Sequence, residues 1–212
     1  MTRDKTGMDP KKIYESLREQ IVWLDLKPES YLNLTELAES FGVSRTPIKE
    51  VLTVLQAEGW VLRNGSHYMV TPLSLGRIKE ITEIRTILEI QANIWALDRI
   101  TAEELSALDE LKSRILGIGK ESGNRQIVEL DVTFHRLLFN ATKNTQLVQL
   151  LDQLMIHYLR FWLSIPREIE PRSFFSEALE IIRAIKAKDR DALRAASAEH
   201  IKKSMDEIIG TF

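Results

Sequence analysis

The fold of the first part of the chain is decided by residues 33–70, NLTELAESFGVSRTPIKEVLTVLQAEGWVLRNGSHYMV. Apolar residues recur at helical spacing on both sides of Gly42, which predicts two helices separated by a turn. Glycine suits that turn because it tolerates the left-handed conformation at a helix end. Asn33 is expected to cap the first helix, with Glu36 as its reciprocal partner, and Asn64-Gly65 predicts a hairpin. The stretch therefore predicts a helix-turn-helix followed by a β-hairpin.

The second of these helices begins with polar residues, and Ser44 is expected to cap it. In helix-turn-helix proteins this end enters the major groove of DNA, and its free N–H groups favour phosphate. The guanidinium of Arg45 suits bidentate contact with guanine, and Lys49 lies about one turn further along. The alternative is that these charges are simply solvated. The candidate DNA-binding residues are Ser44, Arg45, Thr46, Pro47 and Lys49 on the helix, and Arg63, Gly65, Ser66 and His67 near the hairpin tip.

Helical periodicity continues on both sides of this stretch. An apolar spacing from Ile13 to Leu24 predicts a helix before it, and after Thr71–Ser74 there are long helical periods without any strand signal. The predicted fold class is mainly α, with an N-terminal winged helix-turn-helix (three helices plus a β-hairpin) and a C-terminal all-α bundle of six or seven helices. The expected domains are a flexible arm at 1–9, a DNA-binding domain at 10–72 and a helical domain at 73–212. The expected helices of the last domain span about 74–99, 101–121, 124–141, 145–164, 172–188 and 190–209.

Composition limits the possible functions. The 212 residues include no cysteine, which excludes disulfides and thiolate metal sites and fits a cytoplasmic location. No apolar run approaches the roughly 18 residues that span a bilayer, so no membrane is expected. The net charge is -2, and residues 1–72 carry nine Lys and Arg against ten Asp and Glu. DNA binding must therefore depend on the local placement of charge.

The N-terminal part resembles a known family. Leu37-Ala38, the run FGVSRTPIKEVL at 41–52, and Glu58-Gly59 are similar to the winged-helix signature of the GntR family, and the resemblance covers about residues 10–72. It implies that Arg45, Thr46 and Lys49 contact DNA and that the wing reaches the minor groove. There are two departures: Lys49 stands where the family mostly has Arg, and Glu29 stands where Gly is usual.

The helical part contains polar residues on apolar helix faces. Asp131 and His135 are four residues apart, and His200 lies on the apolar stripe of the last helix, so the three can converge in the core. Two imidazoles and a carboxylate suit zinc, nickel, iron or manganese. The alternative is a buried polar network in which Asp131 accepts hydrogen bonds from His135, His200 or Arg85. Arg85 can pair with Asp131 or bind a ligand carboxylate through its planar fork.

Residues 75–209 resemble the FCD ligand-binding domain of the FadR subfamily within GntR regulators. The similarity rests on Arg85 with Glu89, the run DVTFH at 131–135, and His200, together with further positions in the same order. It implies sensing of a small organic acid or related metabolite, and a metal held by one Asp and three His. Asp131, His135 and His200 match three of those ligands, but Ala178 stands at the fourth. The candidate effector-binding residues are Arg85, Asp131, His135, His157 and His200.

The sequence thus predicts a regulator of transcription and not an enzyme. We expect a homodimer, joined largely through the helical domains, that binds a double-stranded DNA operator. Repression is the expected sign, and a small-molecule effector with a carboxylate is expected to modulate the affinity. Two alternatives are a metal-dependent helical-bundle enzyme and a constitutive DNA-binding dimer without an effector.

Overall fold

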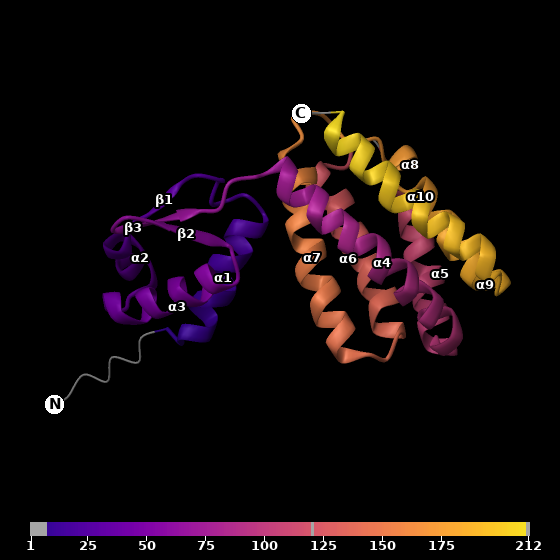
Figure 1. Cartoon of the computed structure of the whole chain (residues 1–212), viewed down its shortest axis with the longest axis horizontal. Coiled ribbons are helices and arrows are strands. Elements are labelled where there is room, and N and C mark those ends of the chain that lie inside the picture. Colours follow the sequence, from indigo (N-terminus) through magenta and orange to yellow (C-terminus); the bar gives the residue numbers. More distant parts are fainter. Residues whose placement is uncertain (1–7, 120, 211–212) are drawn as a thin grey trace. The chain divides into compact units, whose positions relative to one another are not determined.

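The computed structural model describes residues 8–119 and 121–210 and divides the chain into two compact units, 1–73 and 74–212 (Figure 1). The division falls one residue after the expected domain boundary. Residues 1–7 of the expected arm lie outside the described residues. Each unit has its own buried core.

The described residues of the first unit, 8–73, form three helices and a small sheet, in agreement with the predicted winged helix-turn-helix. One strand, β1, was not expected; it pairs with β3 antiparallel and gives the strand order β1-β3-β2. The apolar sides of all three helices form the core, with Ile13, Leu17, Ile48 and Leu52 fully buried. The elements are α1 (Pro10–Val22), β1 (Tyr31–Leu32), α2 (Leu34–Phe41), α3 (Arg45–Ala57), β2 (Val61–Asn64) and β3 (His67–Val70).

The turns of this unit follow the sequence with two corrections. Gly42 ends α2 in the left-handed conformation (φ 64°), as expected. Asn33 caps α2 through its side-chain oxygen, but Glu36 accepts from the Asn33 side-chain amide instead of the backbone, so the predicted reciprocal box does not form. Asn64 pairs with His67 in the sheet, so the two-residue loop of the hairpin is Gly65-Ser66 and not Asn64-Gly65.

Glu29, the departure from the family's glycine, has a φ of 67°. Its backbone N–H donates to the Val70 carbonyl at 2.9 Å, and Val70 N–H donates to the Ser30 carbonyl at 2.9 Å. These bonds tie the α1–β1 connection to β3. The turn therefore keeps the shape that favours glycine, although a side chain in that region costs about 1–2 kcal/mol.

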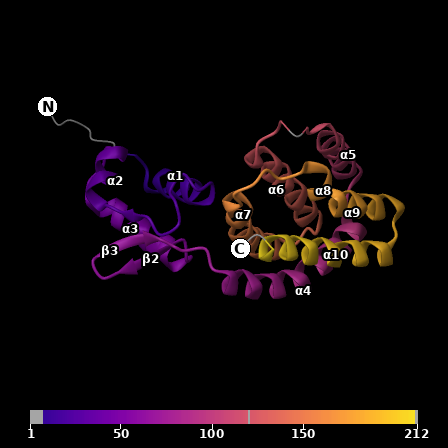
Figure 2. The ribbon, with the colours of Figure 1, turned by 90° about the horizontal axis from the view of Figure 1, so that it is seen from above.

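The second unit is all-helical, with seven helices in its described part (Figure 2). The predicted helix at 172–188 is two helices, because Phe175 leaves helical geometry at ψ 5°. The predicted helix at 101–121 ends earlier, at Gly117. The helices are α4 (Leu75–Arg99), α5 (Ala102–Gly117), α6 (Asn124–Ala141), α7 (Thr145–Ser164), α8 (Pro171–Phe174), α9 (Ser176–Ala187) and α10 (Arg190–Ile209).

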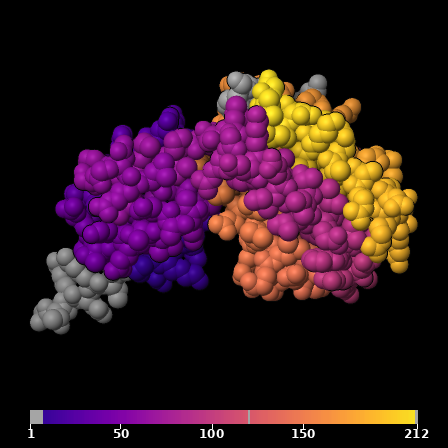
Figure 3. Space-filling view, in the orientation of Figure 1, coloured from indigo at the N-terminus to yellow at the C-terminus, as the bar shows by residue number. Residues whose placement is uncertain are grey.

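The core of this unit lies between α4, α6, α7 and α10. Ala92, Phe139, Leu151 and Met155 form one buried cluster in it. The surfaces of α4 and α10 border each other in the space-filling view (Figure 3), and α4 also packs on α6 and α7. Polar side chains that point inward from these helices are therefore held away from bulk water. No helix in the described part of the chain is long and apolar enough to cross a membrane.

Candidate functional site

The start of α3 presents exposed polar groups. Arg45, Thr46 and Lys49 are exposed, whereas Ile48 between them is fully buried and fixes the helix on the core. Within the described residues, the guanidinium of Arg45 and the ammonium of Lys49 have no hydrogen-bond or ion-pair partner. Ser44 occupies the N-cap position but makes no side-chain capping hydrogen bond, which corrects the expected cap. The Ser44 hydroxyl and the first backbone N–H groups of α3 are therefore available to bind an anion.

Pro47, the fifth predicted residue of α3, is half-buried. The wing, which is the β2–β3 hairpin, carries the remaining four predicted DNA-binding residues. Gly65 has a φ of 62°, and no heavy atom lies within 4 Å of the position a Cβ would take. Ser66 and His67 are exposed at the tip. The Nε of Arg63 donates to the Gly65 carbonyl at 3.2 Å, so this side chain stabilises the turn as well as adding charge. The tip is narrow and open enough for a close backbone approach to DNA.

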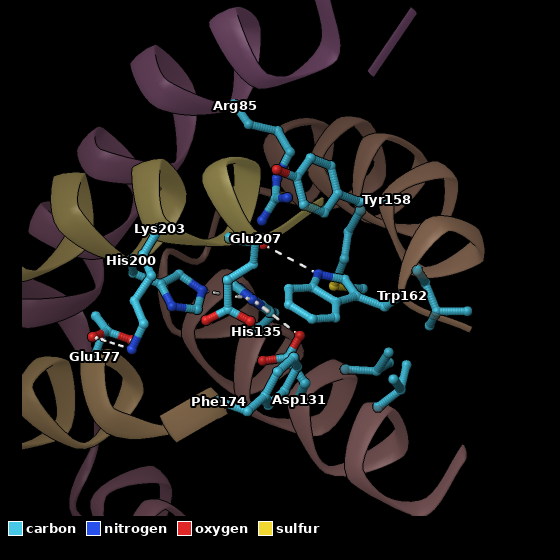
Figure 4. A pocket seen from close by; sticks show the side chains of 15 residues that line it. Arg85, Asp131, His135, Tyr158, Trp162, Phe174, Glu177, His200, Lys203 and Glu207 are labelled. Carbon is cyan, nitrogen blue, oxygen red and sulfur yellow. Dashed lines mark hydrogen bonds and ion pairs between the residues drawn. The ribbon is translucent and has the colours of Figure 1, made fainter. Parts of the chain in front are cut away.

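A buried polar cluster lies between α4, α6 and α10 (Figure 4). His135 Nδ1 lies 3.3 Å from Glu89 Oε1, and His135 Nε2 lies 3.3 Å from His200 Nε2 and 3.6 Å from Asp131 Oδ2. Arg85 Nε donates to Glu89 Oε2 at 3.0 Å, and Arg85 Nη2 forms an ion pair with the same oxygen at 2.9 Å. The three predicted residues therefore meet around His135. Arg85, however, pairs with Glu89 and not with Asp131.

Glu89 was missed as a site residue. It supplies the carboxylate that lies deepest in the cluster: its side chain is 1% exposed, against 18% for Asp131. The signal in the sequence is an Arg and a Glu four residues apart on the apolar stripe of α4. On an amphipathic helix this spacing usually marks a solvated surface pair.

The pKa shifts of the cluster residues determine which of them are charged. Burial acts to raise the pKa of Glu89, but Arg85 and His135 hold it well below its usual range. Burial acts to lower the pKa of His135, but Asp131 and Glu89 raise it overall. Burial, followed by repulsion from His135, lowers the pKa of His200 to about 3. At neutral pH, Glu89 is thus ionised, His135 binds a proton more tightly than usual, and His200 is neutral.

A small cavity opens beside this cluster. Its volume is about 30 Å³, and Asp131, His135 and His200 line it together with Arg85. This is room for no more than a few water molecules. Trp162 and Phe174 also line it, with ring centroids 4.8 Å apart at right angles. A larger ligand therefore requires movement of the lining side chains.

The remaining charges at the cavity are paired. Lys203 Nζ lies 2.9 Å from Glu177 Oε1 and donates to the Ser173 carbonyl at 3.0 Å and to Ser176 Oγ at 2.8 Å. These bonds use the three protons of the ammonium group. They also join α10 to the α8–α9 junction. Both cations that line the cavity thus already have counter-charges.

Two predicted positions do not contribute to the cavity. His157 is buried on α7 but does not line it. Ala178, at the position of the family's fourth metal ligand, is fully buried and carries no donor.

The two imidazoles are spaced to share one metal ion, and the carboxylate grouped with both of them is Glu89, whereas the expected ligand Asp131 approaches His135 but is not part of that group. A zinc ion with tetrahedral bonds of about 2.0–2.1 Å places ligand atoms about 3.4 Å apart, close to the 3.3 Å between the two imidazole Nε2 atoms. Glu89 stands on the other nitrogen of His135, where metal-binding imidazoles commonly donate to a carboxylate. Glu89, His135 and His200 also place ligand atoms within 4.8 Å of one another. A bound ion would take the place of the proton on His135 Nε2.

A winged helix-turn-helix joined to a helical bundle with a buried polar cavity defines a DNA-binding transcription regulator. The comparisons agree. The model for bacterial regulatory proteins of the gntR family matches residues 10–67, and the FCD domain model matches residues 80–203. The chain belongs to the GntR family and carries an FCD domain, as its resemblance implied.

Similar proteins support the assignment over nearly the whole length. The uncharacterized HTH-type regulator YdhC of Bacillus subtilis is 30% identical over 92% of both chains. The HTH-type regulator McbR of Escherichia coli is 24% identical over 92% of this chain and 90% of its own. The solved structure of E. coli McbR/YncC has a TM-score of 0.81, with 24% identity over 95% of this chain and 97% of that chain, and so shares the fold.

Proposed function

We propose that this regulator is a homodimeric repressor that acts in the cytoplasm and binds a double-stranded operator. Its affinity for the operator changes when a small organic acid binds in the cavity between α4, α6, α7 and α10. The observation that carries the proposal is the set of charged and imidazole groups buried at this cavity. A domain that only dimerises has no need of a cavity lined by two imidazoles and a carboxylate, since burying such groups costs free energy even when they are paired.

The charges around the cavity indicate how an acid could bind. The guanidinium of Arg85 is paired with Glu89, and the ammonium of Lys203 is paired with Glu177. A carboxylate entering the cavity would therefore meet Asp131 without a free cation to compensate. A divalent ion held by His135 and His200, with Asp131 or Glu89 as the carboxylate ligand, would supply that positive charge when bound. We therefore expect acid binding to depend on the metal.

Thermal unfolding of the full chain tests this dependence. The protein is treated with a chelator, then loaded with zinc, nickel, iron(II) or manganese, each with and without mono-, di- and tricarboxylic acids. We expect acids to raise the Tm only in a metal-loaded sample. A shift that persists in chelator, or the absence of any metal-induced shift, would contradict the proposal.

Two histidine variants provide the matched control. His200→Gln should abolish the metal-induced shift because it removes a ligand nitrogen. His157→Gln changes another buried histidine that does not line the cavity, so its metal-induced shift should equal that of the wild type. Each shift is taken relative to the variant's own metal-free Tm, which separates metal binding from any loss of stability. Equal responses of the two variants would argue against the ligand set.

The proposed switch acts through the dimer. Two winged helices in a homodimer would meet half-sites about one helical turn, 34–36 Å, apart. An effector that favours one dimer geometry changes DNA affinity by its differential affinity for the two states. A typical coupling of about 1–3 kcal/mol corresponds to roughly 5- to 150-fold. Titration of operator affinity against a stabilising acid measures that factor and gives the sign of regulation.

A further inference from the structure

A groove of about 560 Å³ runs between the wing and the starts of α2 and α3. Arg45 of α3 lines it together with Ser66 and His67 of the wing, and Tyr31 and Thr35 lie in the same lining. None of its lining residues is an Asp or Glu, although the whole chain has a net charge of -2. The groove is thus a local site of positive and hydrogen-bonding character.

DNA geometry indicates what occupies this groove. The start of a recognition helix enters the major groove, whose two edges are sugar–phosphate strands. The wing tip and Arg45 line the same groove of the protein. With the start of α3 in the major groove of DNA, the phosphate strand at its edge lies between α3 and the wing.

Tyr31 is one of the lining residues that were not predicted to bind DNA. It lies on β1, where its backbone pairs with Met69, and it is 62% exposed. Its ring stands edge-on to His67, with centroids 6.0 Å apart, and its hydroxyl oxygen accepts from Asn64 Nδ2 at 3.4 Å. Within the described residues, the hydroxyl proton has no acceptor. The phenol is therefore held by the wing with one donor unused.

We propose that Tyr31 donates this proton to a phosphate oxygen of the DNA strand that lies in the groove. Phosphate oxygens receive half or more of the hydrogen bonds in protein–DNA complexes, and tyrosine hydroxyls are among the donors. The contact positions the wing relative to α3 and carries no base preference of its own. Tyr31 is thus a positioning residue of the DNA interface.

The test compares the full-length wild type with Tyr31→Phe on a duplex selected from a random pool by the wild type. Phe keeps the ring beside His67 and removes only the hydroxyl. Fluorescence anisotropy should show affinity about tenfold weaker, as expected for one hydrogen bond to a charged acceptor. The matched control is Tyr14→Phe, whose hydroxyl donates to Glu58 inside the same unit, and which should bind DNA as the wild type does.

A second measurement locates the contact. Replacing single phosphates by neutral methylphosphonates should reveal one position in each half-site where the replacement weakens binding by the wild type but not by Tyr31→Phe, because the variant has already lost that contact. Unfolding midpoints of both proteins show whether the variant is folded. Wild-type affinity of a folded Tyr31→Phe, or equal losses in both proteins at every phosphate, would overturn the proposal.

Discussion

The polar residues at the start of α3 and those around the cavity of the second unit are arranged in opposite ways. Arg45 and Lys49 are exposed and lack partners within the described part of the chain, whereas Arg85, Glu89 and His135 are buried and paired. The first arrangement leaves charge for an external molecule to neutralise. In the second arrangement the buried charges are paired with one another, and the cavity of about 30 Å³ must rearrange to admit a ligand. Substitutions should therefore change DNA affinity in the first region and folding stability in the second.

The largest expected effect is on the stability of the buried cluster. Glu89→Gln removes the carboxylate that Arg85 and His135 share, which leaves buried positive charge without compensation. We expect a loss of about 3–5 kcal/mol in the free energy of unfolding, measured by urea denaturation. Glu83→Gln, on the exposed side of the same helix, is the control and should change stability by about 0.5 kcal/mol or less. Equal stability of the two variants would show that the cluster is not self-neutralised.

The next effect is a pH dependence of stability in the metal-free protein. The pKa of His200 is lowered to about 3 in the folded protein, whereas its ordinary pKa is about 6.5. Between these two pH values His200 is protonated in the unfolded chain and neutral in the folded chain. The stabilising contribution is therefore present above pH 6.5 and is lost as the pH falls towards 3. The pKa of His135 is raised, so its own stabilising contribution is lost as the pH rises above 6.5 and not as the pH falls over this window.

Between pH 6.5 and pH 5 this loss should amount to about 1–2 kcal/mol, since one pKa unit corresponds to 1.36 kcal/mol. Chemical denaturation in the presence of a chelator measures it. His200→Gln should lose most of that slope. A wild-type stability that is flat over this window would contradict the burial of a neutral His200.

The smallest effect concerns Glu29, which lies in the left-handed region with a φ of 67°. Glu29→Gly should stabilise the first unit by about 1 kcal/mol or less, because relief of backbone strain is partly offset by the greater freedom of glycine in the unfolded chain. Thermal unfolding detects the change. Ser30→Gly, at the next residue of the same turn, is the matched control and should destabilise. A Glu29→Gly protein less stable than the wild type would show that the side chain makes a compensating contact.

The sequence predicted those elements whose ends carry side-chain signals. Asn144 and Asp189 cap α7 and α10 through their side chains, and both helices begin where predicted. Two features lacked such signals. The strand β1 has two residues, too few for a period, and the break at Phe175 contains neither Gly nor Pro and interrupts an otherwise continuous apolar stripe.

The residue types in the sequence predicted which side chains converge at the candidate site, but not which of them pair with one another. His135 and His200 on apolar faces indicated convergence, and their Nε2 atoms lie 3.3 Å apart. Whether Arg85 pairs with Glu89 or with Asp131 depends on the distance between α4 and α6. Helical periodicity in the sequence carries no information on that distance. The same applies to Tyr31, since only the pairing of β1 with β3 brings it beside the wing.

Arg45 is the residue on which DNA recognition by α3 most directly depends. Random duplexes are selected in parallel with the wild type and with Arg45→Ala, and the affinities of both are then measured on the wild-type site. We predict that the wild type selects a two-fold-symmetric site. The variant should bind that site about 1–3 kcal/mol more weakly and lose preference at one base pair of each half-site, with unchanged unfolding. Selection of the same site by Arg45→Ala, with the same affinity and base preference, would contradict the assignment of α3 as the DNA-binding helix.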